Sequence, residues 1–161
     1  MSLNPRYCWV DTWAFERLLA QAEVAARRAP ADARALTELV QSTEKALTLY
    51  PGSFLGGDDA QPWTTSLRER LRGRLLRHLE AVGGHCERAG QLAQAVTCYQ
   101  KGLEVDDCAE QLYRRLMLVY QRLGQQGEAL AVYERCRKIL VALLGVEPSP
   151  QTEAVRQALR S

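Results

Sequence analysis

Apolar residues recur along most of this chain at intervals of three and four, the spacing of one helix face. A first stripe begins after Asp11, a good N-cap, and ends at Pro30. A second stripe follows Asp32, another N-cap residue, and continues to Tyr50. The pattern therefore predicts an opening antiparallel helical hairpin. Before it, the apolar Tyr7–Val10 stretch is predicted to be extended.

A segment dense in turn-forming residues, positions 51–59, separates this hairpin from the rest of the chain. Phe54, Leu55 and Trp63 are large and apolar, so we expect them to pack into the core. Ser66 and Glu69 have the spacing of a capping box, which predicts a long helix from there to Gly90.

The stretch from Leu76 to Leu143 contains one helical hairpin twice. Three pairs of residues are each 34 positions apart: Gly90 and Gly124, Ala95 and Ala129, Tyr99 and Tyr133. This period resembles the tetratricopeptide repeat, with copies at 76–109 and 110–143. We expect helices near 91–105, 109–123 and 126–144, and a last one, capped by Ser149, that ends at Ala158. The predicted fold class is all-α: tetratricopeptide-like hairpins, about seven helices, in a right-handed α-solenoid.

Composition narrows the class of protein. With 161 residues, 47% hydrophobic and 25% charged, the chain can form one well-buried domain. The longest apolar run, Ile139–Leu144, is too short to cross a bilayer and no targeting signal opens the chain, so we expect a cytoplasmic protein. Five cysteines without a C-x-x-C pair indicate reduced thiols rather than a disulfide framework.

The order of several motifs along the chain resembles the bacterial transcriptional activator domain. The matching segments are 9–16, 46–55, Trp63 with 68–71, 113–117, 133–137 and 144–150. The resemblance implies that residues 11–161 form a tetratricopeptide-like regulatory domain, and that residues 1–10 are a linker or remnant of a preceding winged-helix domain. The implied function is self-association or contact with protein partners, RNA polymerase among them, while a separate domain binds DNA. Val141, Ala142 and Gln151 depart from the acidic residues common in the family.

Other chemistry finds little support in the sequence. The glycine-rich loop lacks the Lys-Ser/Thr of a phosphate-binding loop and carries two carboxylates. His78 and Cys86 are two helical turns apart, too far to share a metal ion without outside ligands. The arginines between 68 and 77 divide between two helix faces, which argues against a DNA-binding stripe. No catalytic motif is present, so we expect no enzyme activity, no cofactor and no metal.

The favoured functional surface is the groove lined by the first helix of each repeat. Its candidate lining residues are Arg77, Glu80, Glu87 and Arg88 in one copy and Gln111, Arg114, Leu118, Gln121 and Arg122 in the next. Four arginines against two glutamates suit an acidic partner. An alternative function is therefore a free-standing adaptor that binds acidic peptides or peptide termini. A further alternative is that the flanking helices fill the groove.

Overall fold

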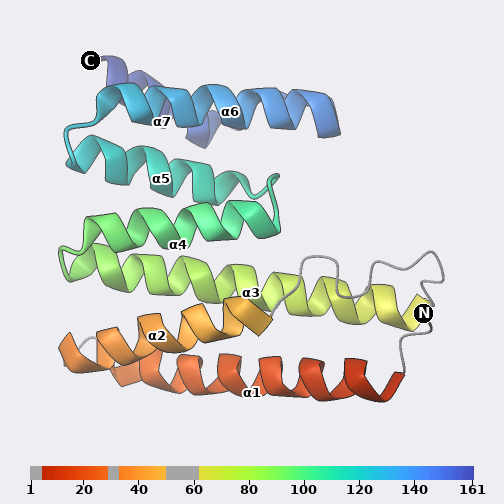
Figure 1. Ribbon diagram of the computed structural model, residues 1–161. Coiled ribbons are helices and arrows are strands. Elements are labelled where there is room, and N and C mark those ends of the chain that lie inside the picture. Colours follow the sequence, from red (N-terminus) through yellow and green to blue (C-terminus); the bar gives the residue numbers. More distant parts are fainter. Residues whose placement is uncertain (1–4, 29–32, 50–61) are drawn as a thin grey trace. The chain divides into compact units, whose positions relative to one another are not determined.

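The chain folds into helices. The computed structural model describes the backbone of residues 5–28, 33–49 and 62–161, and the side chains of 13–28, 34–48 and 65–161. These residues contain seven α-helices and no strand (Figure 1). The helices are α1 (Pro5–Arg28), α2 (Ala33–Leu49), α3 (Pro62–Arg88), α4 (Leu92–Val105), α5 (Glu110–Arg122), α6 (Gln126–Leu144) and α7 (Pro150–Arg160). The prediction of an all-α fold with about seven helices is confirmed.

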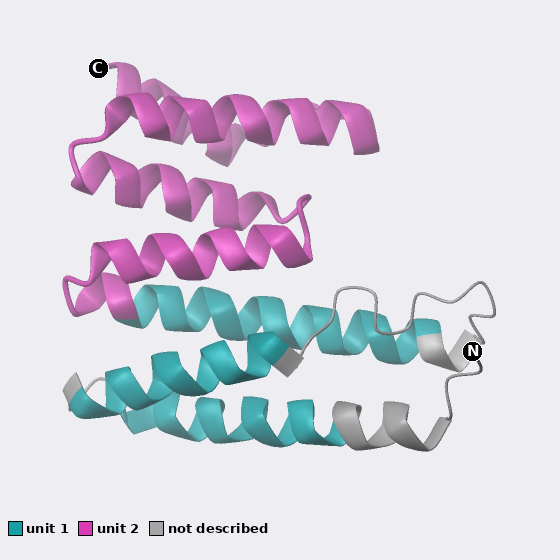
Figure 2. Ribbon diagram, in the orientation of Figure 1, with its two compact units in different colours: residues 1–85 teal, residues 86–161 magenta. Residues whose placement is uncertain are grey.

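The helices belong to two compact units, residues 1–85 and 86–161 (Figure 2). In unit 1, α1 and α2 pack together as the predicted hairpin, and most of α3 belongs to the same unit. Its core is made of the predicted stripes, with Phe15 and Leu19 from α1, Leu39 from α2, and Leu75 and Leu79 from α3 all buried. Helical spacing alone thus identified the core side of each helix.

Unit 2 contains the end of α3 and the helices α4 to α7. The repeat is visible in its turns, since Gly90 and Gly124 both adopt positive φ, at 76° and 72°, directly after a helix. Glycine has no Cβ to clash in this left-handed conformation, which explains why it stands at both equivalent positions. Ala95 and Ala129 are likewise completely buried. Residues 34 positions apart therefore occupy equivalent environments, as the tetratricopeptide-like pattern predicts.

Two predicted helix starts, those of α1 and α3, are wrong. α1 already begins at Pro5, so Tyr7–Val10 is helical rather than extended and Asp11 lies inside the helix. α3 begins at Pro62, which places Ser66 and Glu69 inside it as well. In both cases a proline, whose fixed φ suits the first helical turn, starts the helix before the polar residue that was taken as its cap.

The remaining boundaries agree more closely. α6 has the predicted ends, and α4, α5 and α7 agree to within two residues at each end. The N-cap residue of α5 is Ala109, which makes no side-chain cap hydrogen bond. The predicted cap at Asp32 and the predicted burial of Phe54, Leu55 and Trp63 fall outside the described side chains. No helix in the described ranges is both long and apolar enough to cross a membrane.

Candidate protein-binding surface

The structure divides the predicted groove residues between the two units. Arg77 and Glu80 lie on α3 in unit 1, where Arg77 is exposed beside a cavity. The other seven belong to unit 2. Glu87 and Arg88 end α3, and the other five lie along α5.

Helix α5 presents a distinct outer side in unit 2. Its apolar residues Leu112, Tyr113, Leu116, Met117 and Val119 are buried, which gives the helix a strongly amphipathic character. The opposite side, which we call the α5 face, consists of Gln111, Arg114, Arg115, Leu118, Gln121 and Arg122. Leu118 is the exception to the polar pattern, because it is a large apolar side chain that remains 39% exposed.

The carboxylate of Glu87 is an ion-pair partner of two arginines on the α5 face, Arg115 and Arg122. Its side chain is only 14% exposed and accepts a hydrogen bond of 2.5 Å from the Tyr99 hydroxyl. An Arg122 guanidinium nitrogen lies 3.2 Å from the other carboxylate oxygen, and a second donates to the Glu87 backbone carbonyl at 3.4 Å. Arg115 approaches the same carboxylate at 4.0 Å. One glutamate thus balances part of the charge of two arginines.

A second network connects α5 to the start of α7. Glu110 accepts hydrogen bonds from the Ser149 backbone N–H at 2.7 Å and the Thr152 hydroxyl at 2.5 Å. Burial acts to raise the pKa of Glu110, but these hydrogen bonds and the charge of Arg114 outweigh it and hold that pKa below its ordinary value. Ser149 is the N-cap residue of α7 without a side-chain cap bond of its own. Glu110 therefore caps α7 from another helix.

Arg114 belongs to this network. Its guanidinium lies 3.7 Å from Glu110 and donates to the Thr152 hydroxyl oxygen at 3.2 Å. These contacts connect Arg114 to α7. Arg115 and Arg122 pair with Glu87 instead, and their side chains are about half exposed, at 47% and 49%. Sequence reasoning missed Arg115, although its spacing of four from Gln111 and three from Leu118 places it on the same face.

Two clusters of potential metal ligands can be compared with known requirements. Asp106, Asp107 and Cys108 lie within 4.8 Å of one another, but Asp106 already accepts the Cys108 backbone N–H at 3.0 Å as part of the turn before α5. The second candidate pair, His78 and Cys86, does not share a partner. His78 contacts the Thr43 hydroxyl in unit 1, whereas Cys86 makes a hydrogen bond with Cys98 in unit 2 that lowers the pKa of Cys86. The three groups of the turn are one fewer than the four ligands of a structural zinc site, and His78 and Cys86 each have a separate partner.

A family model and two sequence relatives identify the family of this chain. Regulatory protein AfsR from Streptomyces coelicolor is 32% identical over 122 residues, covering 71% of this chain and 12% of that protein. The protein of the same name from Streptomyces griseus is 30% identical over 157 residues, covering 93% of this chain. The chain spans only 15% of this second relative. The crystal structure of BtubC (BKLC) from P. vanneervenii aligns with 18% identity and a TM-score of 0.40, over 88% of this chain and 63% of that one. The family model named bacterial transcriptional activator domain matches residues 10–160, and the chain belongs to this family.

Proposed function

We propose that this chain is the protein-interaction part of a bacterial transcription regulator, acting by self-association or by contact with partners such as RNA polymerase. DNA is bound by a separate domain, and the chain itself catalyses no reaction. Family membership and similarity to regulatory proteins support the regulatory role. The α5 face supports the proposal that this regulatory role is carried out through contacts with proteins.

The observation that carries this proposal is the position of Leu118. Leu118 is 39% exposed near the middle of α5, and Arg115 and Arg122, close to it in sequence, are about half exposed. Together these three residues have the composition typical of a protein interface. Such interfaces combine an apolar centre with arginine-rich surroundings. The hydrogen bonds of Glu87 hold Arg122 in place before any partner binds, which reduces the entropy lost on binding.

The test combines light scattering on the isolated chain with binding assays against purified RNA polymerase subunits. Leu118→Asp places a charge at the centre of the α5 face and should weaken the observed association at least tenfold, because apolar contact is lost and a carboxylate is desolvated. Val24→Asp is the matched control, since Val24 is similarly exposed, at 47%, but lies on α1 in unit 1. A chain that is strictly monomeric and binds no subunit would refute the proposal. An equal effect of both variants would refute the assignment of the α5 face as the interaction surface.

A second candidate function is that of a free-standing adaptor for acidic peptides. It is favoured by the α5 face carrying Arg114, Arg115 and Arg122 against the carboxylates of Glu87 and Glu110. An acidic peptide could pair with the half-exposed guanidinium groups. Arg88→Glu combined with Arg122→Glu should then abolish binding of a glutamate-rich fluorescent peptide without unfolding the chain. Lys138→Glu on α6 serves as the control, and unchanged binding in the double variant would exclude this function.

A further inference from the structure

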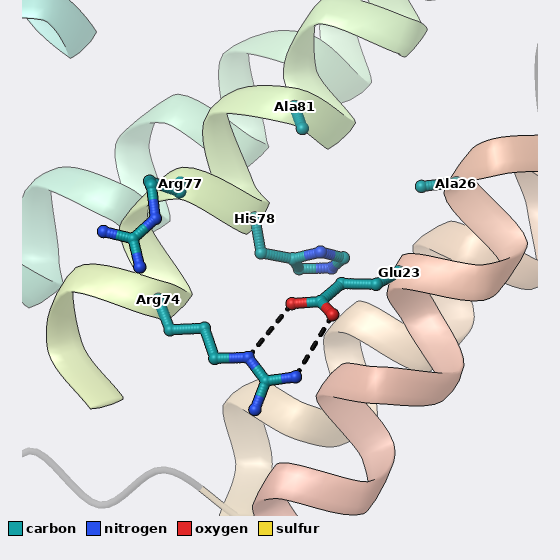
Figure 3. A pocket seen from close by; sticks show the side chains of 6 residues that line it. All are labelled: Glu23, Ala26, Arg74, Arg77, His78 and Ala81. Atoms are coloured by element: carbon teal, nitrogen blue, oxygen red, sulfur yellow. Dashed lines mark hydrogen bonds and ion pairs between the residues drawn. The ribbon is translucent and has the colours of Figure 1, made fainter. Parts of the chain in front are cut away.

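In unit 1, residues of α1 and α3 line a cavity of about 320 Å³ that is open to solvent. Figure 3 shows the six side chains that line it: Glu23 and Ala26 from α1, and Arg74, Arg77, His78 and Ala81 from α3. Two alanines provide small apolar walls, and the other four residues are ionisable. This volume is at the low end of the roughly 300–1,000 Å³ of small-molecule sites, so a ligand would have to be small.

The hydrogen bonds of His78 define which of its ring nitrogens is available. The Thr43 hydroxyl oxygen lies 2.8 Å from both the Leu39 carbonyl oxygen and the Nε2 atom of His78. Two oxygens at that distance require a proton between them, so the hydroxyl donates to Leu39, as threonine does within helices. Nε2 must then donate its own proton to Thr43. This leaves Nδ1 of the neutral ring as a hydrogen-bond acceptor.

Nδ1 has no partner among the described residues. His78 is only 4% exposed, and burial lowers its pKa to about 4, so the ring remains neutral at ordinary pH. In Figure 3 the ring lies beside the Glu23 carboxylate, at the side of the cavity. Two acceptors, an imidazole nitrogen and a carboxylate, therefore belong to side chains that line the same cavity.

The two arginines of the cavity differ in their surroundings. Arg74 donates two hydrogen bonds of 3.1 Å to the two carboxylate oxygens of Glu23. These bonds hold the pKa of Glu23 below its ordinary value, so it is anionic. Arg77 is exposed and makes no ion pair with any residue whose side chain is described. Figure 3 shows the Arg74–Glu23 pair, while among the drawn side chains Arg77 makes no such contact.

We propose that this cavity binds a free amino acid as its zwitterion, with the carboxylate on Arg77 and the ammonium group donating to Nδ1 of His78 and to Glu23. The ammonium group supplies the donor that Nδ1 lacks and adds a donor to Glu23 beside those of Arg74, while the carboxylate pairs with Arg77. The alanine walls leave room for a small side chain. The site shares no residue with the α5 face and would add a metabolite-binding function to a protein-interaction module.

The test follows the imidazole nitrogens of His78 in the full chain by long-range ¹H–¹⁵N NMR spectroscopy. Glycine, L-serine and L-glutamine are added one at a time, up to about 10 mM, because a site with so few polar contacts should have a dissociation constant near 1 mM. We expect at least one of them to shift the Nδ1 signal saturably. Arg77→Gln should weaken that binding about tenfold or more, the usual effect of losing a charge-assisted hydrogen bond.

Two controls separate this site from weaker alternatives. Arg70→Gln removes an arginine of the same helix that pairs with Glu16 and does not line the cavity, and it should leave the titration unchanged. Acetate and methylammonium each carry only one of the two charges and should shift the signal far less than an amino acid. An equal shift with acetate would overturn the zwitterion assignment. The absence of any saturable shift with all three amino acids would overturn the site itself.

Discussion

The burial of His78 makes a sharp prediction about stability and pH. In the folded chain its pKa is about 4, because burial disfavours the charged ring, while its ordinary value is 6.5. Glu23 acts in the opposite direction by attracting the proton, and Arg74 and His85 add to the lowering. Below pH 6.5 the unfolded chain therefore takes up a proton that the folded chain does not. The contribution of the neutral His78 ring to the free energy of unfolding is therefore fully present above pH 6.5 and is lost as the pH falls toward 4.

The size of this effect follows from the two pKa values. Each unit of pKa difference corresponds to about 1.4 kcal/mol, so the full effect at pH 4 is about 3 kcal/mol. Between pH 7 and pH 5 the free energy of unfolding should fall by about 2 kcal/mol. This range lies above the ordinary pKa of glutamate, so carboxylates such as Glu23 and Glu110 contribute little to the change.

Urea denaturation at pH 7 and at pH 5 measures this change, and NMR titration of the imidazole signals measures the pKa directly. His78→Gln is the informative variant, since the glutamine amide can still donate to Thr43 but cannot be protonated. It should remove most of the pH dependence, whatever its own stability. Equal stability of the parent at the two pH values would refute the reasoning, as would a His78 titration near pH 6.5.

Four further predictions concern unit 2. A Cβ at Gly102 would lie 2.4 Å from Cδ1 of the buried Leu112, so Gly102→Ala should lower the free energy of unfolding by about 1–3 kcal/mol in urea titrations. Gly127→Ala, with open space around the new methyl group, should not be destabilising. Ala129→Arg forces a charge into a completely buried position and should lower the melting temperature severely; a melt equal to the parent would contradict the repeat packing. Glu110→Gln should increase amide exchange at the start of α7, and an unchanged rate there would show that its cap is dispensable.

The second half of the fold could be predicted closely because its punctuation is local. Gly90 and Gly124 end their helices through the conformation of a single residue, and Pro150 starts α7 in the same local way. The predicted start of α3 was wrong because two local start signals, a proline and a cap-like serine, lie close together. The cap-like Ser66 lies four residues beyond Pro62, and the sequence gives no measure of which signal is stronger.

The candidate surface was harder to predict, because its charges are set by contacts between helices. Arg122 lies 35 positions from Glu87, about one repeat length, so the stacking of repeats could have indicated this pair. The contact of Arg114 with Thr152 joins the second repeat to a helix outside it. No periodicity relates those two residues, and the role of Arg114 at α7 required the structure.

These contacts change what the α5 face can recognise. Its arginines suggest an electrostatic surface, but Glu87 already pairs with Arg122 and lies near Arg115, and Glu110 lies near Arg114. An incoming carboxylate would have to compete with those partners, so its net gain would be small, as it is for most exposed ion pairs. The apolar contact at Leu118 has no such competitor. Affinity should therefore depend mainly on Leu118, and the salt dependence of partner binding should be shallow.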